Sequence, residues 1–387
     1  MKILVILPSF PYPPNNGYRI KTFNLIDILK NHFEVEVLIL QLRHENFDQS
    51  YFKNNNIRCH SEHIGLIEKG WNLLRAVFNK VPFQSAIYTS KKVRRILQNE
   101  LNHYDYFVCS MIRTSTYLDL LPKSKVIFDM IDLLSKSYSK SKDSTNSILY
   151  KLMYKLEVGR LGNMEKYVVL NSSKVLLVNR EEKELLNRYG NNVKWIPNGV
   201  NKLLFNYELV DRSYSNDIVF FGTMNYQPNV DAIIWLDKYV LDHIDPRIRL
   251  IIIGSNPIKA IMDIKKRRGN IVLTGYLEDP YIILNSCLAV IAPMQNGGGI
   301  QNKLLESMAL GTINIVSKYA AQPIVGAEDG KHFLVKDDPL EYAYCINALY
   351  ADPSKFEFLK EQSRDFIKGA YTWDKYEDLL IPLFKKN

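Results

Sequence analysis

The stretch CLAVIAPMQNGGGIQNKLLESMALG, residues 287–311, holds the residue types best suited to chemistry in this chain. An apolar run ends at a proline, three glycines follow at 297–299, and an apolar-periodic segment then opens with Asn302, Lys303 and Glu306. This order predicts a strand, a glycine loop and a helix N-terminus, whose free N–H groups bind anions. Lys303 adds a positive charge, and Glu306 adds an acceptor for hydroxyl groups. The segment therefore predicts a site for a diphosphate that carries a ribose; the alternative is a plain strand-to-helix turn.

The elements that must position this site alternate between apolar runs and helical patterns along the chain. With 387 residues, the chain is long enough for two α/β domains with full cores. Strands are expected at 2–7, 35–40, 106–110, 126–129, 175–178 and 193–197, and again at 217–222, 249–254, 271–274, 288–292 and 312–317. The alternation predicts parallel sheets covered by helices on both faces. Because the pattern restarts after the turn PNGV at 197–200, we place a domain boundary near it.

Composition limits the class of protein and its partners. No run approaches the roughly 18 apolar residues of a membrane span. The four cysteines are far apart and share no metal-ligand spacing, which fits reduced cytosolic thiols.

The two halves of the chain differ in charge. Residues 1–198 hold 29 Lys and Arg against 18 Asp and Glu, a net charge of +11, whereas residues 199–387 hold 21 Lys and Arg against 23 Asp and Glu. This asymmetry indicates an anionic partner for the first half, such as an anionic membrane surface or a lipid-diphosphate acceptor. Nucleic acid is not expected, because the sequence contains no nucleic-acid module pattern; solubilising lysines are the alternative.

The segment WNLLRAVFNK, residues 71–80, combines aromatic and apolar residues with two cations. It predicts either an interfacial helix that contacts a membrane or an amphipathic helix that packs on the first sheet.

Several segments together resemble the GT-B glycosyltransferases of family 4, and more narrowly the bacterial sugar transferases of exopolysaccharide and capsule clusters. They are PSFPYPPNNGYRIKTFNLIDIL, VKWIPNGVNKLLF, DIVFFGTMNYQPNVDAIIWL, GGGIQNKLLESMALG and YTWDKYEDLL. The resemblance implies two Rossmann-like, doubly wound domains that face a cleft. Residues 1–200 would bind the acceptor, residues 201–370 would bind a nucleotide-sugar, and a helix within 371–387 would pack back on the first domain. The donor, a UDP-sugar, would be a substrate, so no separate cofactor or metal is implied.

The resemblance also assigns roles around the glycine loop. Glu306 matches the second glutamate of a family pair, which binds the ribose hydroxyls, but Gly298 stands where the first glutamate is expected. Its absence leaves the backbone N–H groups of Gly298, Gly299 and Ile300 to face the sugar and the phosphate. Lys303 would stabilise the charge that develops on the departing diphosphate.

Two further positions complete the implied donor set, Gly222 after the first strand of the second domain and Asn302 at the helix start. Many relatives place an Arg and a Lys in the loop that Gly222 opens, but this chain has no cation there. Asn229 and Asp231 follow that loop, where they either contact the ligand or cap the next helix.

In the first domain, Gly17 resembles the family glycine that lets the backbone approach the donor phosphate; an ordinary turn is the alternative. Arg113 follows the strand at 106–110, and Asp129 and Asp132 end the next strand. These carboxylates either act as the acceptor base or orient the acceptor, or they cap the following helix. The predicted catalytic residues are therefore Lys303, Asp129 and Arg113.

The implied reaction is a metal-independent sugar transfer with retention of configuration, in which the departing phosphate deprotonates a lipid-linked or oligosaccharide acceptor. The expected location is cytoplasmic, with contact to the inner face of the plasma membrane left open. The alternatives are a non-catalytic nucleotide-sugar-binding scaffold of a polysaccharide assembly complex and a nucleotide-sugar 2-epimerase.

Overall fold

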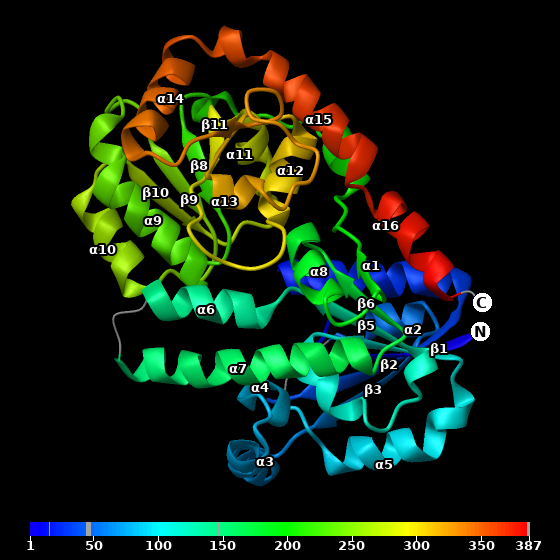
Figure 1. Ribbon diagram of the computed structural model, residues 1–387. Coiled ribbons are helices and arrows are strands. Elements are labelled where there is room, and N and C mark those ends of the chain that lie inside the picture. The colour runs from blue at the N-terminus through cyan, green and yellow to red at the C-terminus, as the bar shows by residue number, and fades with distance from the viewer. Residues whose placement is uncertain (15, 44–47, 145–147, 385–387) are drawn as a thin grey trace. The chain divides into compact units, whose positions relative to one another are not determined.

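The computed structural model describes the backbone of residues 1–14, 16–43, 48–144 and 148–384. The chain divides into two compact units, shown in Figure 1. Unit 1 comprises Met1–Pro197 and Glu377–Asn387, and unit 2 comprises Asn198–Tyr376. Each unit contains its own sheet of parallel strands, as the alternating sequence pattern predicts.

The sheet of unit 1 has its strands in the order β3-β2-β1-β4-β5-β6-β7. Their bounds are β1 Lys2–Leu7, β2 Glu34–Gln41, β3 Arg58–His63, β4 Tyr106–Ser110, β5 Val126–Ile131, β6 Lys174–Leu177 and β7 Val193–Trp195. Because the order reverses between β1 and β4, the carboxyl ends of these two strands flank the topological switch point, where ligands of open α/β sheets bind. The sequence analysis missed β3, whose residues RCHSEH are polar and lie at the sheet edge.

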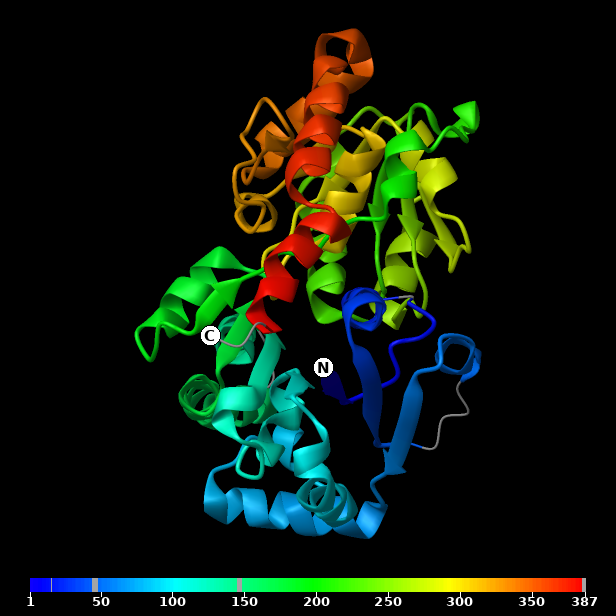
Figure 2. The ribbon, with the colours of Figure 1, turned by 90° about the vertical axis from the view of Figure 1, so that its right-hand side faces the viewer.

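Helices cover both faces of this sheet, as Figure 2 shows from a second side. They are α1 Gly17–His32, α2 Ser50–Asn54, α3 Leu66–Asn79, α4 Phe83–Ala86, α5 Lys91–Glu100, α6 Leu134–Ser144, α7 Ile148–Leu170 and α8 Arg180–Asn187. The returning end of the chain also packs on unit 1. Glu377 of α16 (Trp373–Leu380) contacts His32 at 2.7 Å, and the ring of Phe384 lies 5.1 Å from that of Phe33.

Unit 2 repeats the same order, β10-β9-β8-β11-β12-β13, with the switch point between β8 and β11. Its strands are β8 Ile218–Phe221, β9 Leu250–Ile253, β10 Ile271–Gly275, β11 Ala289–Ala292, β12 Asn314–Val316 and β13 Leu334–Val335. Its helices are α9 Gln227–Tyr239, α10 Lys259–Arg267, α11 Tyr281–Ser286, α12 Asn302–Leu310, α13 Lys318–Ala321, α14 Pro339–Ala351 and α15 Phe358–Ala370. Both units are therefore doubly wound, and the predicted glycine loop connects β11 to α12.

Of the two alternatives for the segment 71–80, the helix that packs its apolar side on the first sheet is wrong. This segment belongs to α3, of which only Ala76 is buried, whereas Trp71 and Phe78 are 60% and 76% exposed. The apolar residues of α3 thus face solvent, because the side chains that hold the helix to unit 1 are polar ones. In the part of the chain that the structure describes, none of the helices is both long and apolar enough to cross a bilayer.

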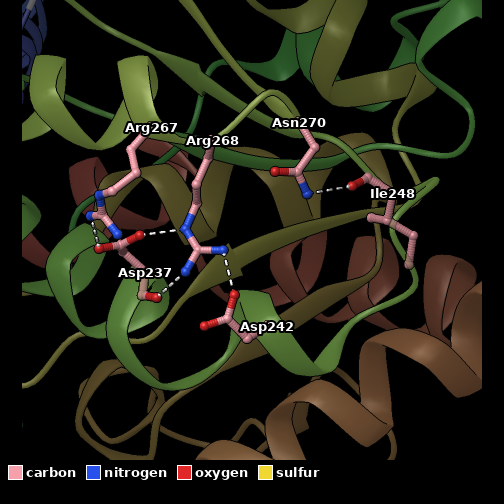
Figure 3. Close-up of polar contacts among 6 residues, drawn as sticks. All are labelled: Asp237, Asp242, Ile248, Arg267, Arg268 and Asn270. Carbon is pink, nitrogen blue, oxygen red and sulfur yellow. Dashed lines mark hydrogen bonds and ion pairs between the residues drawn. The ribbon is translucent and has the colours of Figure 1, made fainter.

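A polar cluster joins α9 to the end of α10 in unit 2 (Figure 3). The carboxylate of Asp237 accepts from Arg267 at 2.7 Å and from Arg268, which also donates to Asp242 at 2.8 Å. Asp237 is buried and Arg268 is largely buried, whereas Arg267 is 60% exposed.

We expect Asp237→Ala to lower the free energy of unfolding by about 2 kcal/mol, because it removes charge-assisted hydrogen bonds from a partly buried arginine. Urea denaturation measures the change. Lys355→Ala, which removes an exposed partner of Asp352, is the control and should leave the denaturation midpoint unchanged. Equal midpoints for Asp237→Ala and the wild type would show that the cluster adds nothing to stability.

Candidate functional site

The loop after β8 brings a glycine and an asparagine together at the carboxyl end of the second sheet. Gly222 has a φ of +147°, and a Cβ atom there would lie 2.7 Å from the amide nitrogen of Asn229. That amide nitrogen donates to the carbonyl of Thr223 at 3.0 Å. Glycine is thus required at 222 because Asn229 occupies the space that a side chain would need.

Lys303 meets Asn229 beside this loop. Its ammonium donates to Asn229 Oδ1 at 2.8 Å and lies 4.1 Å from the centre of the Phe220 ring. The side chain is only 8% exposed, and no carboxylate among the described residues pairs with it. Because burial disfavours the charged form, the pKa of Lys303 is lowered to about 7. The fold therefore holds a buried cation that a bound anion would stabilise.

This geometry corrects the helix-cap alternative for Asn229 and Asp231. Helix α9 begins at Gln227, after Tyr226, and no side chain caps it. Asn229 instead binds Lys303, and Asp231 accepts from Asn296 at 2.9 Å, which ties α9 to the glycine loop.

The glycine loop presents unpaired backbone donors. Gly297 and Gly299 have φ of +122° and +66°, and the Gly297 carbonyl accepts from the hydroxyl of Tyr319. Among the described residues, no acceptor is found for the N–H groups of Gly298, Gly299 and Ile300, and no side chain caps the N-terminus of α12. Free N–H groups at a helix start, beside a buried lysine, form an anion-binding site.

Glu306 lies one turn into α12 and is half-buried, so the structure does not make it a solvent-facing glutamate. Burial raises its pKa to about 7, and a hydrogen bond with Tyr281 of α11 partly opposes this shift. The other predicted residue of this helix, Asn302, accepts from the side-chain amide of Asn198 at 2.9 Å. The structure thus brings the predicted donor residues of the second domain together at the switch point of unit 2.

In unit 1, Asp129 at the end of β5 is completely buried and forms an ion pair with Lys21 of α1, which is also buried. One carboxylate oxygen of Asp129, Oδ2, has no hydrogen-bond partner among the described residues. The burial and the pairing favour a structural role for Asp129, and its role as acceptor base remains a prediction.

At the carboxyl end of β5, the groups that cap the following helix come from residues that the sequence analysis did not single out. Glu182 accepts from the Leu133 N–H at 3.0 Å, and Glu165 accepts from the Ser135 N–H at 2.9 Å, so these two carboxylates cap α6 in place of Asp129 or Asp132. Burial raises the pKa of Glu182 to about 8 and that of Asp132 to about 6. Glu165 and Glu182 follow Ser135 and Leu133 by 30 and 49 residues, so no local pattern could have identified them.

Arg113 and Gly17 also lie at carboxyl strand ends of unit 1. Arg113 follows Met111, whose φ is +63°, and its guanidinium lies 5.7 Å from the Tyr88 ring centre. A non-glycine residue in this backbone region marks local strain of the kind found at functional sites. Gly17 is the first residue of α1, which Asn16 caps by accepting from the Arg19 N–H at 3.0 Å. The roles predicted for Arg113 and Gly17 remain predictions.

A separate open hollow of about 780 Å³ lies at the amino ends of β8 and β9 in unit 2, lined by Asn216, His243, Arg247, Asn347 and Tyr350 among others. Ligands of doubly wound sheets bind at the carboxyl ends, so we place the site at Lys303. His243 lines this hollow and not the Lys303 site.

Comparisons with known proteins bear on the family and the fold of the chain. Residues 215–352, which include the whole Lys303 site, match the family model described as glycosyl transferases group 1. A Klebsiella pneumoniae protein described as an uncharacterized 44.6 kDa protein in the cps region is 23% identical, over 100% of both chains.

Two solved structures share the fold over nearly the whole chain. Sucrose-phosphate synthase from Thermosynechococcus elongatus has a TM-score of 0.73 at 15% identity and covers 99% of this chain and 98% of its own. Anabaena HepE in complex with UDP-glucose has a TM-score of 0.65 at 14% identity, covering 98% of this chain and 97% of its own. The chain has the GT-B fold of two Rossmann-like domains, and these comparisons together support a glycosyltransferase.

Proposed function

We propose that this glycosyltransferase moves a sugar from a nucleotide-sugar, a UDP-sugar in the first instance, to a lipid-linked or oligosaccharide acceptor, with retention of configuration. The donor site is inferred from the buried Lys303. This lysine has no carboxylate partner in the described structure and lies beside the free N–H groups of 298–300. A diphosphate supplies the negative charge that this arrangement lacks. Glu306, one turn further along α12, would accept from the ribose hydroxyls.

The same groups suit the chemical step. As the glycosidic bond breaks, negative charge develops on the leaving diphosphate, and a preorganised ammonium with backbone donors stabilises that charge. The departing phosphate, held beside the acceptor hydroxyl, would take its proton. This front-face transfer leaves the anomeric configuration retained and uses no metal. Arg113 and the sheet edge of unit 1 would contact the acceptor.

Two relatives support the substrate classes without fixing them for this chain. Anabaena HepE is described in complex with UDP-glucose, which supports a UDP-sugar donor. The Klebsiella relative lies in a cps region, which supports a surface-polysaccharide acceptor in an exopolysaccharide or capsule pathway.

A thermal-shift screen of the purified protein against UDP, GDP, CMP, dTDP and their sugars tests the donor class. We expect UDP and UDP-sugars to raise the melting temperature, because a ligand that binds only the folded state stabilises it. Stabilisation by GDP alone would reassign the base, and no shift with any nucleotide would overturn the donor site.

Glu306→Gln is expected to weaken UDP binding by roughly tenfold, since it replaces a carboxylate acceptor by a neutral one. The same variant should bind 2′,3′-dideoxy-UDP as the wild type does, because that ligand lacks the hydroxyls. Isothermal titration calorimetry measures both affinities. Glu361→Gln on α15 is the matched exposed control. If Glu306→Gln lowers the affinity for UDP and for the dideoxy analogue equally, Glu306 does not contact the ribose hydroxyls.

A non-catalytic scaffold is the second candidate, and Gly298 favours it because a family glutamate is missing there. A scaffold would bind the nucleotide-sugar without consuming it. Release of UDP from the UDP-sugar in the presence of membrane acceptor distinguishes the two: transfer supports the enzyme, and binding without turnover supports the scaffold.

A further inference from the structure

Helix α3 of unit 1 directs a continuous apolar surface toward solvent. Leu66, Ile67, Trp71, Leu74, Val77 and Phe78, here called the α3 stripe, are between 51% and 82% exposed. At about 100° per residue, the six positions fall within an arc of about 140° on one side of the helix. The buried Ala76 lies on the other side. Single exposed apolar residues are ordinary, but a contiguous apolar face of this kind marks an interaction site.

Polar side chains, in contrast, hold α3 to the rest of unit 1. Lys69 donates to the Leu42 carbonyl and Asn72 to the Thr89 carbonyl, each at 2.7 Å. The helix is therefore amphipathic in the opposite sense to a helix that packs on a core, with its polar side inward and its apolar side outward. Figure 1 shows α3 at the lower edge of unit 1, where no other labelled element covers its outer side.

Cations border the stripe. Arg75 and Lys80 are exposed on α3 or at its end, and neither side chain forms an ion pair within the described residues. Lys91 lies close by, because its backbone N–H donates to Glu68 Oε1 of α3 at 2.8 Å. An apolar stripe with aromatic residues and bordering Lys and Arg matches the interface of an anionic bilayer in both hydrophobicity and charge.

We propose that the α3 stripe inserts into the headgroup and acyl boundary of an anionic lipid bilayer and docks unit 1 on that surface. A second copy of this chain is the alternative occupant, and analytical ultracentrifugation distinguishes it from the bilayer. This inference deepens the proposed function and rests on it for the lipid-linked acceptor. Docking would hold unit 1 at the membrane surface where such an acceptor lies.

Co-sedimentation of the full chain with vesicles tests the docking without any nucleotide. We expect strong binding to phosphatidylcholine vesicles that contain phosphatidylglycerol and weak binding to phosphatidylcholine alone. Raising NaCl from about 0.05 M to about 0.5 M should weaken the binding, because the electrostatic part is screened. A failed thermal-shift screen would remove the donor site and leave this result unaffected, so the two proposals fail separately.

The double variant Trp71→Gln/Phe78→Gln should lose at least about tenfold in vesicle affinity, and Arg75→Glu/Lys80→Glu should lose the preference for anionic vesicles. Leu203→Gln/Tyr344→Gln, which replaces two residues of unit 2 that are at least as exposed as Trp71 and Phe78, respectively, is the matched control and should bind as the wild type does. Unchanged melting temperatures confirm that the variants are folded. The proposal is overturned if the wild type does not bind vesicles, if the stripe variant binds equally well, or if the stripe variant instead abolishes a dimer seen by analytical ultracentrifugation.

Discussion

Replacing Lys303 by methionine is expected to reduce sugar transfer by about two to three orders of magnitude and to remove the stabilisation by UDP. Methionine keeps an unbranched apolar stem beside Phe220 and removes only the ammonium that donates to Asn229. The loss therefore reports the charge that faces the leaving diphosphate. Initial rates with a UDP-sugar and calorimetric titration with UDP measure the two effects. Lys368→Met, at an exposed lysine of α15, is the control.

The pH dependence of Lys303 supplies an independent signature. Its pKa is about 7 in the folded protein against 10.5 for an ordinary lysine, so the unfolded chain binds more protons between these values. The free energy of unfolding of the unliganded protein should thus rise with pH across that window, and this rise should be absent in Lys303→Met. UDP affinity should fall above pH 7, since the bound diphosphate requires the protonated amine. Unchanged UDP affinity in the variant would show that Lys303 does not bind the donor.

Asp129→Ala is expected to be the most destabilising single change, lowering the free energy of unfolding by roughly 3–5 kcal/mol. The substitution leaves the ammonium of Lys21 buried without its carboxylate partner. The double variant Lys21→Met/Asp129→Leu should recover most of the loss, because an apolar pair of similar volume needs no compensating charge. Urea denaturation measures both, and Asp119→Ala, which removes an exposed partner of Arg94, is the control.

The double variant also separates a structural role of Asp129 from the predicted catalytic one. If the only role of Asp129 is its ion pair with Lys21, which joins the end of β5 to α1, the refolded double variant should transfer sugar at close to the wild-type rate. A stable but inactive double variant would instead support Asp129 as the acceptor base. A single variant as stable as the wild type would contradict the importance of the buried ion pair.

The sequence by itself determined the features that depend on residues close together along the chain. The apolar run, the three glycines and the helix that carries Lys303 and Glu306 occur within 25 consecutive residues, and the structure forms them as β11, the loop and α12. The alternation of short apolar runs with helical patterns likewise specifies doubly wound parallel sheets, since a buried parallel strand is apolar along its whole length. Strands β3 and β13 are the exceptions: both lie at a sheet edge, β3 is polar and β13 has only two residues.

Only the tertiary structure decided which distant side chains meet. Lys303 binds Asn229 across 74 positions, and Lys21 pairs with Asp129 across 108, so no local spacing indicates either contact. The same reason explains why Glu165 and Glu182, and not the nearby aspartates, cap α6. For α3, periodicity shows that the helix has an apolar side but not which way that side faces. The direction depends on the packing of the whole unit, which turns the α3 stripe toward solvent.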